Sequence, residues 1–207
     1  ESYEVNRLRV YNLLLTSQKW REYTWRHQLA ILVPPEITYD KALLYITGGS
    51  NTDEMPNWKK RDNDEIKMIG AIAAKNKAIA AVLCQVPNQP LYDGLKEDAL
   101  ISFTLHNYLK DKDYTWPLLF PMTKSAIRAM DAVQQFSSQI LKHNISGFLV
   151  SGASKRGWTT WLTGASDSRI VAIAPMVINM LNMPKSIPYH VESWGDYSEQ
   201  IKDYVDL

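Results

Sequence analysis

The chain has 207 residues, of which 45% are hydrophobic and 22% are charged, a composition typical of one ordinary α/β domain. Its net charge is only +1, and its lysines and arginines are scattered, so no basic stripe indicates a nucleic-acid partner. No apolar run reaches the roughly 18–20 residues of a membrane span, and a single cysteine, Cys84, can form no intrachain disulfide.

The first half of the chain predicts two strands and a helix. Residues 21–33 mix alternation with an apolar end, which predicts an outer strand or a hairpin. Residues 42–47 form a compact apolar run followed at once by Gly48 and Gly49, which indicates a buried strand ending in a flexible polar loop. Residues 65–74 have apolar side chains at helical spacing and predict a helix.

The second half continues this alternation of strands and helices. The near-continuous apolar character of residues 77–86 indicates a strand buried on both faces of a parallel sheet. Helices are expected over residues 96–109 and over residues 123–143, the latter capped by Thr123, and a buried strand over residues 169–178. Strands and helices in this order predict an α/β fold with crossover units on a parallel sheet flanked by helices.

The most informative stretch is residues 145–165, which combine an apolar strand, a sharp turn carrying Ser154 and a helix. This layout is typical of a nucleophile elbow. The motif departs from the usual G-x-S-x-G, because Gly157 stands one place later than expected and Arg156 occupies the position of a small residue. The alternative is a structural serine that caps the following helix, since serine is a favoured N-cap.

A nucleophilic serine requires backbone donors for the oxyanion of its tetrahedral intermediate. In an elbow, one donor is the N–H of the residue after the serine, here Lys155, at a helix start where N–H groups are unpaired. The second comes from a loop after an earlier strand. We expect it from the loop of Gly48 and Gly49, because glycine allows close backbone approach.

Two interpretations stay open for the cationic side chains of Lys155 and Arg156. They are either solvated charges in the first turn of the helix, or cations that help to hold an oxyanion or an acidic group of the substrate. The second interpretation makes Arg156 a substrate-binding residue. The helix dipole supports the second interpretation, because it disfavours cations at the N-terminus of a helix unless they have another role.

The general base is not identified by the sequence. His190 follows the serine in chain order, as an α/β-hydrolase requires, and Asp196 is the matching acid, but neither lies after a further recognisable strand. The other histidines are interpreted as structural: His27, His106 and His143. No metal-ligand spacing, phosphate loop or dinucleotide fingerprint is present, so no metal or cofactor is expected.

Several segments resemble the PhoPQ-activated pathogenicity-related protein family, which includes the autocrine proliferation repressor proteins. They span most of the chain and comprise QVPNQP (85–90), WPL (116–118), PMTK (121–124), SGASKRGWTTW (151–161) and APMVI (174–178). The spacing of Gly152, Ser154 and Gly157 is also similar to that of glucuronoyl esterases, in which a basic residue follows the serine as Lys155 does here.

The resemblance implies an α/β-hydrolase-like, exported protein, secreted or periplasmic, with Ser154 as nucleophile. Because family members are about twice as long, it implies that residues 1–207 are one domain that forms the N-terminal portion of a longer protein. Its C-terminal strands, acid and histidine are then expected beyond Leu207. The chain begins at Glu1, which indicates the removal of an upstream targeting segment or another piece.

The sequence thus predicts a serine hydrolase that acts on an ester or a peptide bond, with a small-molecule or peptide substrate. The alternative is a non-catalytic signalling or surface-binding protein on the same scaffold. Residues 179–207 are expected to be a lid or the start of an insertion. A strand edge left unpaired near residues 169–178 is expected to favour self-association.

Overall fold

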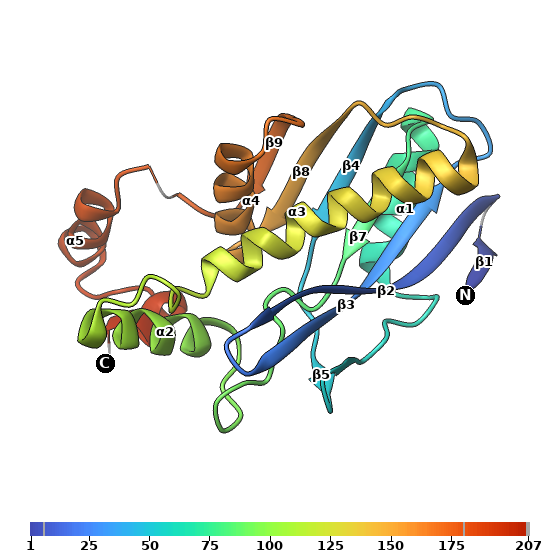
Figure 1. Ribbon diagram of the computed structural model, residues 1–207. Helices are drawn as coiled ribbons and strands as arrows, with labels where there is room; N and C mark the ends of the chain where they lie inside the picture. Colours follow the sequence, from blue (N-terminus) through green and yellow to red (C-terminus); the bar gives the residue numbers. More distant parts are fainter. Residues whose placement is uncertain (6, 180, 206–207) are drawn as a thin grey trace.

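The apolar runs of the sequence form the central strands of a seven-stranded sheet in the computed structural model, which describes residues 1–5, 7–179 and 181–205 (Figure 1). The spatial order of the strands is β1-β2-β3-β7-β4-β8-β9. Their bounds are β1 Ser2–Val5, β2 Leu8–Trp20, β3 Tyr23–Val33, β4 Lys41–Ile46, β7 Ala80–Leu83, β8 Gly147–Ala153 and β9 Ile170–Met176. A separate two-stranded ladder pairs β5 (Asn51–Thr52) with β6 (Met55–Pro56).

The sheet is mixed, so the prediction of a parallel sheet holds for only part of it. Strands β7, β4, β8 and β9 are mutually parallel, whereas β1, β2 and β3 form an antiparallel meander whose last strand pairs antiparallel with β7. Strands joined by short turns must run antiparallel, and the crossover geometry begins only where helices connect the strands. Residues 21–33, predicted as an outer strand or a hairpin, form the single strand β3 and the turn before it. This strand is not an outer one, because it pairs with β2 on one side and β7 on the other, and the prediction has no counterpart of β1 and β2.

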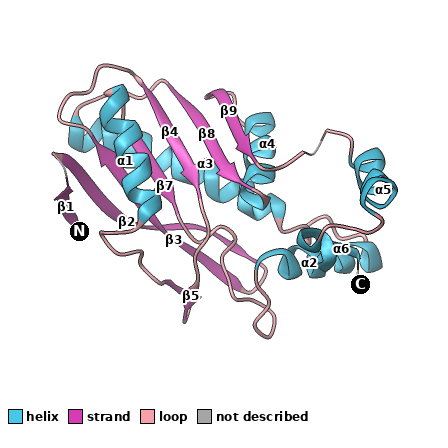
Figure 2. Ribbon diagram, turned by 180° about the vertical axis from the view of Figure 1, so that it is seen from behind, coloured by secondary structure: helices cyan, strands magenta, loops and turns pink. Residues whose placement is uncertain are grey.

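Helices cover both faces of the sheet, as expected for an α/β fold. Figure 1 shows α3 and α4 in front of the sheet. Figure 2 shows the opposite face, with α1 in front of the sheet. The helices are α1 Asp64–Asn76, α2 Glu97–Asp111, α3 Leu119–Phe136, α4 Lys155–Ser166, α5 Met183–Trp194 and α6 Lys202–Val205, with a π-helix over Ser137–Leu141 and a 3-10 turn over Glu199–Ile201.

The core divides along the sheet because side chains of a strand alternate between its faces. In β3, Leu29 and Ile31 belong to the core on the side of α3, whereas Ala30 and Leu32 belong to the core on the side of α1. Each helix contributes a buried stripe to its own layer, such as Ile66 and its neighbours from α1. The two layers hold the central strands rigidly.

Helix α3 begins earlier than predicted, so the prediction that Thr123 caps it is wrong. The first helical residue is Leu119, and Thr123 lies a turn inside, where its hydroxyl donates to the Leu119 carbonyl at 2.8 Å. Pro121 masked this start, yet proline is tolerated in the first turn, where backbone N–H groups have no intrahelical acceptor. The last residues of the predicted helix form the π-helix instead.

Strand β9 is the last strand of the sheet at the end opposite β1, and it pairs only with β8 among the described residues. On the α1 side, an apolar groove of about 450 Å³ runs over β4, β8 and β9, with Leu149, Ala174 and Met176 among its lining. The edge predicted near residues 169–178 is therefore present, but the prediction that this strand is buried is wrong, because β9 has no buried residue.

The C-terminal stretch is helical and lies beside α2 (Figures 1 and 2). The Tyr204 hydroxyl of α6 donates to Asp98 of α2 at 2.7 Å. The expectation of a lid or insertion over residues 179–207 stays a prediction, and residues 180, 206 and 207 lie outside the described residues. No helix in the described ranges is long and apolar enough to cross a membrane.

Candidate active site

Ser154 lies between the end of β8 and the start of α4, in the strand–turn–helix that the sequence predicts. Its backbone has φ 54° and ψ −125°, a conformation that is strained for any residue with a side chain. The surrounding structure holds it there: its N–H donates to the Met176 carbonyl at 2.9 Å, and its carbonyl accepts from the Trp158 N–H at 2.9 Å. Strain of this kind is characteristic of a nucleophile elbow.

Ser154 stands at the N-cap position of helix α4, but its hydroxyl makes no capping hydrogen bond, so the interpretation of Ser154 as a serine whose side chain caps the helix is wrong. It makes no hydrogen bond to any residue that the structure describes. The strained turn therefore presents an uncommitted hydroxyl at the carboxyl edge of the parallel strands.

Two glycines allow the tight packing of the elbow. A Cβ on Gly152 would lie 2.8 Å from the Arg156 carbonyl oxygen, in the first turn of α4. A Cβ on Gly157 would lie 2.5 Å from Ile178 Cγ2 and 2.9 Å from the Met176 carbonyl oxygen. The late second glycine of the motif is thus required where α4 crosses the end of β9.

The glycine loop after β4 lies beside the elbow. Ile46 of β4 pairs in parallel with Gly152 of β8, so the loop and the serine leave the sheet at the same edge. Gly48 has no room for a side chain, because a Cβ would lie 2.5 Å from Arg156 Nη2. The N–H groups of Gly48 and Gly49 donate to none of the described residues, which leaves them available as oxyanion donors.

The carbonyl oxygens of the same loop are held by the segment after β7. The Gly48 carbonyl accepts from the Gln85 N–H at 3.2 Å, and the Gly49 carbonyl accepts from Gln89 Nε2 at 2.9 Å. The loop is therefore fixed through its acceptors while its donors stay free.

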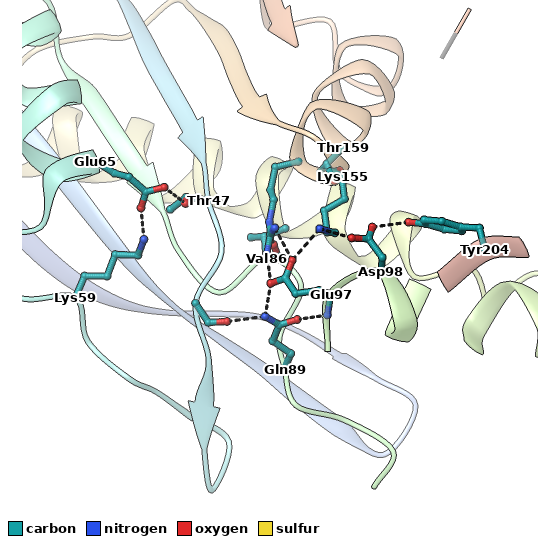
Figure 3. A network of polar contacts seen from close by, with 12 residues as sticks. Thr47, Lys59, Glu65, Val86, Gln89, Glu97, Asp98, Lys155, Thr159 and Tyr204 are labelled. Atoms are coloured by element: carbon teal, nitrogen blue, oxygen red, sulfur yellow. Dashed lines mark hydrogen bonds and ion pairs between the residues drawn. The ribbon is translucent and has the colours of Figure 1, made fainter. Parts of the chain in front are cut away.

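Lys155 and Arg156 are not solvated, so the first interpretation of their charges is wrong. The Lys155 side chain is only 9% exposed, and its Nζ contacts Glu97 at 2.9 Å and Asp98 at 2.7 Å. The Arg156 guanidinium donates to both carboxylate oxygens of Glu97, each at 2.7 Å, and its Nε donates to the Val86 carbonyl at 2.5 Å. Figure 3 shows this network around Glu97. The predicted role of Arg156 in substrate binding stays a prediction, and its contacts here are internal.

Two opposing effects set the charge of Glu97. Burial disfavours its carboxylate, but hydrogen bonds from Arg156, Gln89 and Lys155 more than offset that penalty and lower the pKa of Glu97 to about 2. Glu97 is therefore ionised at neutral pH. Burial first, and then the hydrogen bond to Asp98, raise the pKa of the Tyr204 hydroxyl, which stays protonated as a donor.

The sequence did not identify the acidic half of this network. Glu97 and Asp98 stand in the first turn of α2, where acids complement the helix dipole, but this explains only part of their role. The available signal was the pair of cations at the start of α4, because cations at that end of a helix need a carboxylate partner. Which acids serve them depends on tertiary structure.

None of the predicted acid–base residues contacts the Ser154 hydroxyl. His190 lies on α5, and its Nδ1 is buried without a hydrogen-bond partner among the described residues. Asp196 follows α5 and accepts from the Tyr197 N–H at 2.7 Å. Figures 1 and 2 both show α5 set apart from the sheet that carries the elbow. Both roles stay predictions.

The remaining histidines do not reach the serine either. His27 is fully buried within β3, and His143 places Nε2 3.1 Å from the Tyr39 carbonyl. His106 lies on α2 beside a shallow pocket between α2 and α6. Within the described part of the chain, no group of three or more His, Cys, Asp or Glu side chains is arranged to hold a metal ion.

Known proteins resemble this chain both in sequence and in fold. The family model of the PhoPQ-activated pathogenicity-related protein matches residues 1–207. Autocrine proliferation repressor protein A of Dictyostelium discoideum is 37% identical over 206 residues, which cover 94% of this chain and 40% of that protein. The chain thus spans less than half the length of this relative.

Solved structures of similar shape are esterases. A cold-adapted esterase from an Arctic intertidal metagenomic library superposes with a TM-score of 0.51 at 13% identity, over 84% of this chain and 62% of that one. Acetyl xylan esterase 1 from Thermoanaerobacterium sp. superposes with a TM-score of 0.50 at 12% identity, over 99% of this chain and 63% of that one. At this level of identity the likeness establishes the fold, and the predicted α/β-hydrolase-like fold is confirmed.

Proposed function

Because the chain belongs to the PhoPQ-activated pathogenicity-related protein family, we propose that it carries the nucleophile and oxyanion half of a serine hydrolase that cleaves an ester or a peptide bond. The observation that carries the proposal is the strained backbone of Ser154, φ 54°, with a hydroxyl that makes no hydrogen bond within the described residues. Such strain persists only where the structure enforces it, and enforced strain is concentrated at functional sites.

In the proposed reaction, Ser154 Oγ attacks the carbonyl carbon of the substrate and its proton passes to a general base. The carbonyl oxygen becomes an oxyanion, which the N–H of Lys155 and the N–H groups of Gly48 and Gly49 stabilise. Collapse of the tetrahedral intermediate expels the alcohol or amine and leaves an acyl group on Ser154, which water then removes. The dipole of α4 adds to the stabilisation, since its positive end faces the serine.

The base and the acid are the open positions of this mechanism. His190 and Asp196 are the candidates within the chain, and neither bonds to Ser154 in the described structure. The activity of the whole protein is therefore part of the proposal. Serine proteases that lack a triad member retain roughly 10³–10⁴-fold catalysis over water from the oxyanion hole and binding, so a weak activity is expected from this chain, and the part of it that forms an acyl-enzyme depends on Ser154.

An ester is the better supported substrate class. The neighbouring solved structures are described as esterases, including one for acetyl xylan. Ester hydrolysis also needs less help from a general acid, because an alkoxide leaves more readily than an amide nitrogen. A small-molecule ester is the first substrate to test.

The competing proposal is a non-catalytic signalling or surface-binding protein on the hydrolase scaffold. The observation in its favour is the name of the relative, an autocrine proliferation repressor, together with the absence of a described acid or base in contact with Ser154. On this proposal, substitution of Ser154 changes no reaction rate.

Hydrolysis of p-nitrophenyl acetate by the purified chain distinguishes the two proposals. We expect a rate above buffer that falls clearly in the Ser154→Ala variant. A matched control is Ser151→Ala, three residues earlier in β8, whose hydroxyl donates to the Ala174 carbonyl at 2.7 Å and which should retain activity. Equal rates from the Ser154→Ala variant and the unmodified chain would exclude the hydrolase.

We also propose that the chain self-associates through β9 and that the protein is exported, to the periplasm or beyond. The first proposal rests on the unpaired edge of β9 next to the apolar groove. The second rests on the family resemblance, and cell fractionation with an antibody to the chain tests it.

A further inference from the structure

Three hydrogen-bonded side chains connect the two candidate parts of the oxyanion site. We propose that Glu97 is a positioning residue, an inference that rests on the proposed function. Glu97 would fix the Gly48–Gly49 loop relative to the Ser154 elbow, through Gln89 on the loop side and Arg156 on the elbow side. The connection joins segments that lie far apart in the sequence (Figure 3).

The contact with the elbow is a two-point contact. Arg156 lies two residues after Ser154 in the first turn of α4, and its fork donates to both oxygens of Glu97 at 2.7 Å. A bidentate arginine–carboxylate pair fixes orientation as well as distance. The same guanidinium lies against Gly48, so it contacts the loop directly.

The contact with the loop passes through Gln89. Its Nε2 donates to the Gly49 carbonyl at 2.9 Å and to Glu97 Oε1 at 2.6 Å, and its Oε1 accepts from the Glu97 N–H at 2.8 Å. Glu97 is thus held at its backbone and at its side chain by one amide. Its own backbone is left-handed, with φ 52°, at the first residue of α2.

A carboxylate is required at position 97 by the charges around it. Lys155 and Arg156 place two cations at the N-terminus of α4, where the helix dipole opposes them, and both are largely buried. Replacing Glu97 by glutamine removes the negative charge and turns one acceptor into a donor that faces other donors. Two buried cations would then lack part of the negative charge that neutralises them, which is strongly unfavourable.

The expected consequence is a displaced oxyanion site. Oxyanion donors act only within about 2.7–3.1 Å of the developing charge, and a displacement of about 1 Å can lower a rate by about 100-fold. Loss of Glu97 should therefore slow acylation of Ser154 while leaving ground-state binding nearly unchanged.

The test is the kinetics of phosphonylation of Ser154 by a fluorophosphonate in the intact chain. We expect Glu97→Gln to lower the first-order rate constant of labelling by about 10- to 100-fold. The probe concentration that gives half the maximal labelling rate should change by less than about threefold. The matched control is Asp131→Asn. Asp131 has the same side-chain exposure as Glu97, 40%, and like Glu97 it pairs with two cations, here Arg128 and Arg169, but it lies on α3. The labelling rate constant of Asp131→Asn should stay within about threefold of that of the unmodified chain.

Gln89→Ala provides the second variant, because it cuts the connection to the loop and leaves the ion pair with Arg156 in place. It should also slow labelling, and the double variant with Glu97→Gln should be no slower than Glu97→Gln alone, since residues of one network are not additive. Labelling of folded Glu97→Gln or Gln89→Ala at the unmodified rate would overturn the proposal.

Hydrogen exchange separates this proposal from the proposed function. The Gln85 N–H donates to the Gly48 carbonyl and the Asn51 N–H to the Gln89 carbonyl, so their exchange reports on the loop without any reaction. Glu97→Gln should accelerate both. If the unmodified chain is not labelled, the hydrolase fails; unchanged exchange in the variant would then overturn the positioning role as well, and faster exchange would support it.

Discussion

At the residue scale, the surroundings of each polar side chain decide between a chemical and a structural role. His27 and Ser17 form a buried pair, with His27 Nε2 2.9 Å from Ser17 Oγ and Nδ1 3.0 Å from the Cys84 carbonyl. Because Nδ1 faces a carbonyl, it carries the proton, and Nε2 accepts from the serine. The pair resembles a serine–histidine dyad, but it is enclosed in the core and reaches no solvent.

The buried His27 predicts a pH dependence of stability. Burial lowers the pKa of His27 to about 4, whereas an unfolded histidine titrates near 6.5. Between these values the unfolded chain binds a proton that the folded chain does not, so stability falls as the pH falls through this window, by up to about 1.4 kcal/mol per pH unit. Above pH 6.5 neither state is protonated and the effect vanishes.

Urea unfolding at pH 7.5 and pH 5 measures this effect. The free energy of unfolding of the unmodified chain should decrease between these values more than that of His27→Gln, which has no imidazole to protonate. His143→Gln, at a histidine that is only partly buried, is the control and should behave like the unmodified chain. The carboxyl of Glu97 titrates below its ordinary pKa and does not contribute above pH 5. Equal pH dependence in His27→Gln and the unmodified chain would contradict the assignment.

The sequence was sufficient to place the residues whose position depends on local geometry. The elbow serine, the glycines beside it and the glycine loop were all identified from strand–turn–helix patterning. Glu97, Gln89 and Tyr204 were not, because their roles arise from contacts between α2, α4 and α6, which no local pattern encodes.

At the element scale, the packing of α4 against the sheet depends on the absence of a side chain at Gly157. An added Cβ would meet the Met176 carbonyl oxygen, a backbone atom that cannot turn away. We expect Gly157→Ala to lower the free energy of unfolding by about 1–3 kcal/mol, the usual effect of overpacking.

The matched control is Gly70→Ala, within helix α1. There a Cβ would lie 3.0 Å from Leu8 Cδ2, the end of a side chain that can adjust, and alanine gains about 1 kcal/mol of helix propensity over glycine. Its stability should stay within about 1 kcal/mol of the unmodified chain. Urea unfolding of both variants tests the comparison, and an equal loss in both would contradict it.

The elements were predicted well where their burial is uniform and less well elsewhere. The central strands and helices α1, α2 and α4 lie close to their predicted bounds. Strand β2 has no counterpart in the prediction because its exposed and buried residues follow no strict alternation, and a bulge between Thr16 and Gln18 shifts its register as well. The start of α3 was hidden by Pro121, a residue that ends most helices but is compatible with a first turn.

At the scale of the whole molecule, the sheet has one edge that the described chain does not cover. Beyond β9 no described strand pairs, and on the α1 side of the same strand the exposed Ala172 lies next to the apolar groove. Unpaired edges of this kind favour association with another chain.

We expect the sedimentation coefficient of the chain to rise with concentration. Ala172→Lys should reduce this rise, because a charge on an edge strand opposes pairing. Ala71→Lys, at an exposed alanine of α1, adds the same charge away from the edge and should leave the rise with concentration unchanged. A single species of monomer mass up to about 100 μM, within the range where exposed edges associate, would contradict self-association through β9.

The most direct test of the account is to find where a fluorophosphonate attaches to the chain. The probe reacts faster with a serine whose developing oxyanion is held by backbone donors than with a solvated surface serine. Peptide mapping by mass spectrometry after treatment should place the label on Ser154, at a rate above that of every other serine, and the Ser154→Ala variant should remain unlabelled. An unlabelled Ser154, or equal labelling of Ser154 and the serines elsewhere on the surface, would contradict the assignment of the elbow as a catalytic site.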